Sequence, residues 1–84
     1  MFSLGYIAYI RRDFSDALLW FTRAVKKDHH RSNYWIGKMY WRGEGVLKDQ
    51  KRAQEFFAQA ADKKVVEAQR ALRFLGFLAN SKRP

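Results

Sequence analysis

The 84-residue sequence contains no cysteine and only one proline. Without cysteine the fold cannot depend on disulfides or on a thiolate zinc site, and a cysteine nucleophile is excluded. Five glycines and a hydrophobic content of 48% are also far from the compositions of collagen-like and disordered chains. The chain is therefore expected to fold by packing alone, around a single small core.

Long uncharged segments are missing as well. The longest are residues 1–10 and 74–81, and both fall well short of the roughly 20 apolar residues that a bilayer span requires. The apolar N-terminal residues precede Arg11 and Arg12, which is the reverse of the order in a signal peptide. We predict no membrane span and no signal peptide in this chain. The compartment stays open, with the cytoplasm favoured over export.

Acidic residues are scarce, since 8 Asp and Glu oppose 17 Lys and Arg to give a formal net charge of +9. Such a charge favours acidic partners, which include acidic proteins, nucleic acids and anionic membrane surfaces. The basic residues are dispersed over the ends of the predicted helices and the loops, and they accompany no nucleic-acid-binding motif. Nucleic acid is therefore disfavoured as the partner, and most of these cations are assigned to a solvated surface.

The sequence repeats itself at an offset of 36 residues. Segment 17–24 aligns with segment 53–60, so that alanine and aromatic residues coincide. The matched pairs are Ala17/Ala53, Trp20/Phe56, Phe21/Phe57 and Ala24/Ala60. Their spacing of three, one and three residues describes one side of a helix. A second match, between residues 4–5 and 36–37, has an offset of only 32. The first loop between helices is therefore predicted to be four residues shorter than the equivalent loop of the next repeat.

Turn and capping residues divide the chain between these helices. Gly43 and Gly45 predict a turn, while Asp49 and Asp13 stand where a side chain would cap the helix that follows. Gly37, in the middle of a helix, suggests that another backbone packs against it. The predicted helices span residues 2–11, 14–27, 31–42, 50–62 and 65–80.

One run of residues resembles a known family, the Sel-one-like repeat, which is related to the tetratricopeptide repeat. The residues that carry the resemblance are Ser32, Ile36, Gly37, Tyr40, Gly43, Gly45, Val46, Asp49, Ala53, Phe56, Ala60 and Ala61, followed by Ala68 and Leu72. The first unit has a shorter connection and looks more like a plain tetratricopeptide repeat. In the third unit Arg73 replaces the helix glycine of the family and Gly76 replaces Tyr40, so this unit is degenerate and is expected to act as a cap.

The resemblance implies an all-α fold, a right-handed α-α superhelix or solenoid of about two and a half helical hairpins. We expect one domain, residues 1–84, with unit one at 2–31, unit two at 32–67, a capping unit at 68–80 and a tail at 81–84. The structural residues of the repeat are expected to be Gly5, Ala17, Ala24, Gly37, Tyr40, Gly43, Gly45, Asp49, Ala53, Ala60 and Ala68. Such repeats bind other proteins on a concave surface, and the resemblance supplies no catalytic residues and no cofactor.

The concave surface of such a solenoid is lined by the first helix of each hairpin. The repeat offsets predict four rows of outward residues: Tyr6, Lys38 and Phe74; Tyr9, Trp41 and Phe77; Phe2, Tyr34 and Arg70; and Ile10, Arg42 and Leu78. Of these we assign Phe2, Phe74, Phe77 and Leu78 to the core. The predicted partner-binding residues are Tyr6, Tyr9, Tyr34, Lys38, Trp41, Arg42 and Arg70. Aromatic and arginine side chains dominate protein-binding hot spots, so an acidic peptide with apolar anchors is the expected partner.

Patterns for other chemistry are weak. The adjacent histidines of segment 28–30 lack a third ligand at a suitable spacing, so no metal site is predicted. None of the serines has a base in a nucleophile pattern, so no catalytic residue and no enzyme activity are predicted. The glycine turn at 43–45 follows a helix and lacks the strand and the Lys-Ser/Thr pair of a phosphate-binding loop.

Two alternatives to partner binding in the groove stay open. Open ends of a solenoid expose apolar faces, so the chain could join copies of itself or form part of a larger repeat array. The net charge of +9 leaves nucleic-acid binding as a third and weaker hypothesis.

Overall fold

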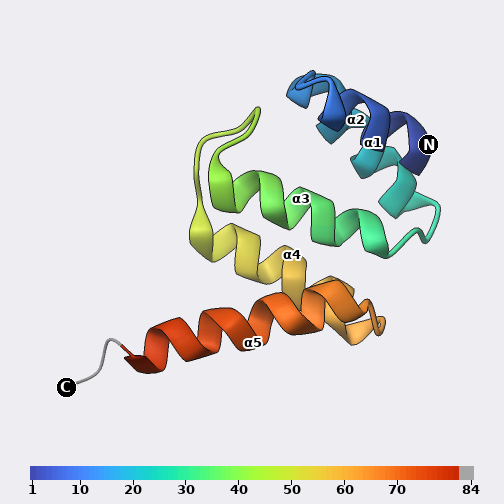
Figure 1. Ribbon diagram of the computed structural model, residues 1–84. Helices are drawn as coiled ribbons and strands as arrows, with labels where there is room; N and C mark the ends of the chain where they lie inside the picture. The colour runs from blue at the N-terminus through green and yellow to red at the C-terminus, as the bar shows by residue number, and fades with distance from the viewer. Residues whose placement is uncertain (82–84) are drawn as a thin grey trace.

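The computed structural model describes residues 1–81, and the side chains of residues 1–76. This part of the chain forms five α-helices and no strand (Figure 1). The helices are α1 (Phe2–Ile10), α2 (Phe14–Lys26), α3 (Arg31–Arg42), α4 (Gln50–Asp62) and α5 (Val66–Ser81). The five predicted helices are confirmed, and no end differs from its prediction by more than one residue.

Each helix packs mainly against the next helix in the chain. Two hairpins, α1–α2 and α3–α4, follow one another along the molecule, and α5 lies beyond α4 (Figure 1). The molecule is elongated, with extents of 44 × 25 × 17 Å, as expected for a stack of hairpins rather than a closed bundle. The structure is therefore a short helical solenoid. The first hairpin packs on the second through α2 and α3, and the second packs on α5 through α4.

Within each hairpin the two helices approach closely where a glycine faces a phenylalanine ring. A Cβ atom on Gly5 would lie 2.6 Å from Cδ1 of Phe21, and one on Gly37 would lie 2.7 Å from Cδ1 of Phe57. Both rings are buried, and they occupy equivalent positions of the repeat. Gly37 was predicted to make room for a backbone; the ring of Phe57 is the nearer neighbour, with the carbonyl oxygen of Ala53 next at 3.2 Å.

The alanines of the repeat are buried, and they include two pairs at equivalent positions, Ala17/Ala53 and Ala24/Ala60. Ala17, Ala53, Ala60 and Ala68 are completely buried and Ala24 almost completely. A larger side chain at these positions would push the packed helices apart, which explains why the repeat keeps alanine there.

The connections after α2 and α4 also repeat each other in hydrogen bonding. The amide of His29 donates to the carbonyl of Ala24 at 3.0 Å, and the amide of Val65 donates to the carbonyl of Ala60 at 3.1 Å. Just before these amides, Asp28 and Lys64 have the same left-handed φ of 65°. The two units are therefore alike in backbone conformation as well as in sequence.

The longer connection between α3 and α4 depends on the glycine turn. Gly43 and Gly45 have φ values of 73° and 75°, which other residues adopt only with strain. Asp49 caps α4 as predicted, because its Oδ1 accepts a hydrogen bond of 3.0 Å from the amide of Arg52. Asp13 precedes α2 but makes no side-chain capping bond, so that part of the capping prediction is wrong.

An ion pair joins the starts of α3 and α5. Nε of Arg31 lies 3.0 Å from Oε2 of Glu67, and these residues are equivalent positions of successive units. Both side chains are exposed, so the pair adds little to stability. None of the helices in the described part of the chain has both the length and the hydrophobicity that a bilayer span requires.

The glycine contacts generate a stability prediction. A Gly37→Ala substitution should lower the free energy of unfolding by about 1–3 kcal/mol, because the new methyl group would displace the ring of Phe57. Urea denaturation followed by circular dichroism measures the change.

Gly76→Ala is the matched control, since Gly76 also lies within a helix but has no neighbour within 4 Å of its would-be Cβ. This variant should be unchanged or more stable by up to about 1 kcal/mol, which is the helix preference of alanine over glycine. Equal effects of the two substitutions would contradict the close-approach explanation.

Candidate partner-binding surface

Aromatic side chains fill the space between α1 and α3. The ring of Trp35 lies at the centre of this cluster, with its centroid 5.5 Å from Tyr6, 5.3 Å from Tyr9 and 5.8 Å from Tyr34. It also stacks on the core ring of Phe21 at 6.0 Å. The aromatic cluster of Tyr6, Tyr9, Tyr34 and Trp35 thus connects the surface shared by α1 and α3 to the core of the first hairpin.

Lys38 lies over this aromatic cluster. Its Nζ is 4.6 Å from the ring centroid of Trp35 and 5.8 Å from those of both Tyr9 and Tyr34. Rings at such distances attract a cation through their negative faces. Burial lowers the pKa of Lys38 from its ordinary value, and the positive charge of Arg42 lowers it further. The aromatic cluster therefore holds a partly desolvated ammonium group at the surface.

Tyr9 links the aromatic cluster to the glycine turn. Its hydroxyl donates a hydrogen bond of 2.8 Å to Oε1 of Glu44. Burial, with a smaller contribution from the Glu44 carboxylate, raises the pKa of Tyr9 to about 12. The hydroxyl therefore stays protonated at physiological pH and fixes α1 against the end of α3.

A groove with a volume of about 140 Å³ lies between α3 and α5. Its lining residues are Lys38, Trp41, Arg42, Phe57, Ala71, Phe74 and Leu75, and we call it the α3–α5 groove. Ala71 follows Trp35 by 36 residues and so holds the equivalent position in the next unit. The methyl group of Ala71 leaves open the space that the indole of Trp35 fills between α1 and α3.

The α3–α5 groove combines an apolar wall with a cationic edge. Lys38 and Arg42 contribute the cations, and neither forms an ion pair with any residue of the described chain. Trp41 and Phe74 contribute aromatic surface. This arrangement can accept an apolar side chain that is accompanied by acidic groups.

The structure brings only some of the predicted site residues together. Lys38, Trp41 and Arg42 line the α3–α5 groove, and the rings of Tyr9 and Tyr34 adjoin it through Lys38. The remaining two predicted residues are both exposed: Tyr6 lies against Trp35, while Arg70 is not among the residues that line the groove.

The core assignments made from the sequence have mixed outcomes. Phe2 is half-buried and packs against the core cluster, as predicted. Phe74 was assigned to the core but is 61% exposed, because its position on α5 faces the open groove instead of another helix. The side chains of Phe77 and Leu78 lie outside the described residues.

Sequence reasoning missed Trp35, the residue on which the aromatic cluster depends. It stands between the predicted surface residue Tyr34 and the buried Ile36, so helical periodicity alone placed it on neither side. The available signal was the repeat offset, which pairs Trp35 with Ala71. A large side chain in one unit and a small one at the equivalent position of the next indicate a gap that is filled between α1 and α3 and open between α3 and α5.

His29 lies at one end of the aromatic cluster, stacked on Phe2 at a centroid distance of 4.5 Å. Its Nδ1 shares a hydrogen bond of 2.9 Å with Oγ of the buried Ser32. Burial lowers the pKa of His29 below its ordinary value of 6.5, with additional repulsion from Arg31. These contacts give His29 a role in packing the start of α3.

Comparison with known proteins agrees with this architecture. The family model of the Sel1 repeat matches residues 1–29 and 30–65. Sel1 repeats are helical, solenoid-type repeats that generally mediate protein–protein interactions and are not typically enzymatic. No curated protein matches the chain.

His29 generates a pH-dependence prediction. Because its pKa is lower in the folded state, the unfolded chain binds more protons once the pH falls below about 6.5. The free energy of unfolding should therefore decrease as the pH falls from about 6.5 toward the lower folded pKa, and be unaffected by His29 above that window. Urea titrations at several pH values from about 7.5 to 5.5 measure the slope.

A His29→Gln variant should lose most of this slope, while a His30→Gln variant should retain it. Glu67, whose pKa is also lowered, acts at pH values below its ordinary 4.5 and does not affect this range. An unchanged slope in His29→Gln would show that another group carries the dependence.

Proposed function

Because the chain belongs to the Sel1 repeat family, we propose that it is a protein-interaction module whose α3–α5 groove binds an acidic segment of a partner protein. The observation that carries this proposal is the apolar groove beside Lys38 and Arg42, two cations that form no ion pair with the residues the structure describes. An apolar anchor of the partner would enter between Trp41 and Phe74. The cations would select acidic neighbours of that anchor and accelerate encounter.

The aromatic cluster supports this proposal by fixing the cationic edge in advance. Three rings surround the ammonium of Lys38, so less side-chain freedom remains to be lost when a partner binds. Tyr6 and Arg70 would contact only a partner that extends beyond the groove, and Tyr9 and Tyr34 would act mainly by holding Lys38.

Charge reversal tests the proposal. A fluorescent synthetic peptide with glutamates on both sides of a Phe-Phe pair serves as the probe, and fluorescence anisotropy measures its dissociation constant. A Lys38→Glu/Arg42→Glu variant should bind it at least about tenfold more weakly and with less dependence on salt.

The matched control is an Arg23→Glu/Lys51→Glu variant, which changes the net charge equally at exposed positions outside the groove. An Ala71→Leu variant, which fills the groove and leaves all charges in place, should also weaken binding. If the two charge reversals weaken binding equally and Ala71→Leu has no effect, attraction is unspecific and the groove is not the site.

Self-association is a second candidate function, favoured by one face of α1. Leu4 and Ile7 are 47% and 49% exposed, whereas Ile36 and Met39, their equivalents at the offset of 32, are 3% and 0% exposed. In unit two the preceding hairpin covers these positions. We propose that the same face of α1 is covered by a second copy of the chain when the protein is concentrated.

Sedimentation equilibrium tests this assembly. The weight-average mass should rise above 10.0 kDa as concentration increases, and Ile7→Lys should abolish the rise by placing a charge in the contact. Leu47→Lys is the control, because Leu47 is an equally apolar exposed residue in the α3–α4 connection. A monomer at every concentration would remove this candidate.

A further inference from the structure

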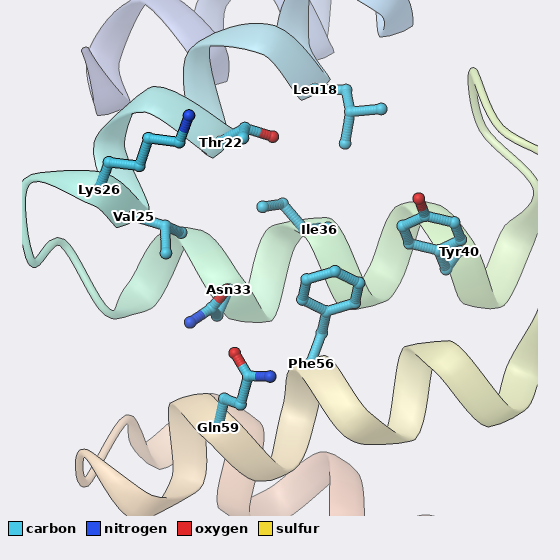
Figure 2. Close-up of a pocket in the computed structure, with 9 residues that line it drawn as sticks. All are labelled: Leu18, Thr22, Val25, Lys26, Asn33, Ile36, Tyr40, Phe56 and Gln59. Carbon is cyan, nitrogen blue, oxygen red and sulfur yellow. The ribbon is translucent and has the colours of Figure 1, made fainter.

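A second groove lies on another part of the surface, between α2 and α4 and across α3. It has a volume of about 260 Å³, and Figure 2 shows its lining residues converging from all three helices. They are Leu18, Thr22, Val25, Lys26, Asn33, Ile36, Tyr40, Phe56 and Gln59. We call this the α2–α4 groove; it shares no residue with the α3–α5 groove.

The middle of the α2–α4 groove is apolar. Ile36 projects into it from α3, with Leu18 and Val25 on the α2 side and Phe56 on the α4 side (Figure 2). The ring of Phe56 stacks on Tyr40 with centroids 5.4 Å apart, which closes one end. The volume lies below the roughly 300–1,000 Å³ of pockets that take drug-sized ligands, so an amino-acid side chain is a better fit than a cofactor.

The other end of the α2–α4 groove carries two carboxamides. Figure 2 shows the side chains of Asn33 and Gln59 turned toward each other across the groove, from α3 and α4. Asn33 is only 6% exposed, yet its carboxamide has no hydrogen-bond partner among the residues that the structure describes. Its nitrogen and oxygen reach the surface of the groove, where they are available to a ligand, and a carboxamide can both donate and accept.

The chemistry of this end matches a peptide bond. A peptide group also presents one donor and one acceptor, and in an extended segment both are free to pair with a side-chain amide. In a helix they are already used within the helix. The carboxamides therefore favour an extended occupant over a helical one.

The positive charge at the edge of the groove favours an acidic occupant. Lys26 extends along it on the α2 side, and no acidic residue lines the groove (Figure 2). Arg52 lies over the Tyr40 ring at 5.5 Å and adds a second cation near the closed end. An acidic residue next to the inserted side chain would complement this edge.

We propose that the α2–α4 groove binds an extended segment of a partner protein that carries an aliphatic residue beside an acidic one. The aliphatic side chain packs on Ile36, its backbone peptide group pairs with Asn33 and Gln59, and the acidic residue lies near Lys26. This site is separate from the α3–α5 groove, so the module would hold two segments at once.

Solution NMR with small peptide mimics tests this inference. The probe is N-acetyl-glutamyl-leucine N-methylamide, and its counterpart with glutamine in place of glutamate tests the charge. The first should shift the resonances of the Leu18, Val25 and Ile36 methyl groups and of the Asn33 and Gln59 side-chain amides. It should bind more tightly than its counterpart, and Lys26→Gln should remove that difference.

Four variants separate binding from structure. Asn33→Leu should lower the affinity for the probe about fivefold or more, as expected for one lost hydrogen bond, while the urea midpoint stays the same or rises. Gln59→Ala should weaken it similarly, whereas Gln54→Ala, on the same helix but outside the groove, should not. The Lys38→Glu/Arg42→Glu variant should bind the probe as the wild type does.

Three results would overturn the inference. They are the absence of shifts in the groove residues, equal effects of Gln59→Ala and Gln54→Ala, and a clear loss of stability in Asn33→Leu. The last would assign the carboxamide of Asn33 to folding and not to ligand binding.

Discussion

The contact between a glycine and a phenylalanine ring determines how closely the helices of each hairpin approach. Gly5 with Phe21 and Gly37 with Phe57 are the same contact in successive units, and a single methyl group on either glycine would enter the ring. Alanines on the facing helices keep this distance over the rest of the contact. In α5 the exposed Arg73 takes the glycine position, so no helix approaches there in the described part of the chain.

The grooves lie between successive hairpins. Stacked hairpins leave a gap between α1 and α3, another between α3 and α5, and a third, on the other side of α3, between α2 and α4. One residue decides whether each gap is filled: Trp35 fills the first, whereas Ala71 leaves the second open. The third is lined by Ile36 of α3 between Leu18 of α2 and Phe56 of α4, and it stays open (Figure 2). The shape of the surface can therefore change in this fold through a residue such as Trp35 or Ala71, while the Gly–Phe contacts within the hairpins stay the same.

Helical periodicity and the repeat offset predicted all five helices, because both depend on residues close in sequence or on exact self-similarity. Lys38, Trp41 and Arg42 were predicted for the same reason, as residues on the outward side of one helix. Periodicity does not reveal whether another helix covers an apolar side, so Phe74 was assigned to the core. The central role of Trp35 depends on rings from three helices, which no local pattern encodes.

Exposed apolar surface costs a chain of 84 residues a large part of its stability, because small domains have only a few kcal/mol of net stability in reserve. The ring of Phe74, which is 61% exposed, lowers that reserve in the free protein. A partner that covered this ring and bound only the folded chain would restore stability by mass action. Both grooves also share α3, so an occupant of one would stabilise the helix packing that forms the other. Binding at either proposed site would therefore be linked to folding through α3, the helix that contributes Lys38 to one groove and Asn33 to the other.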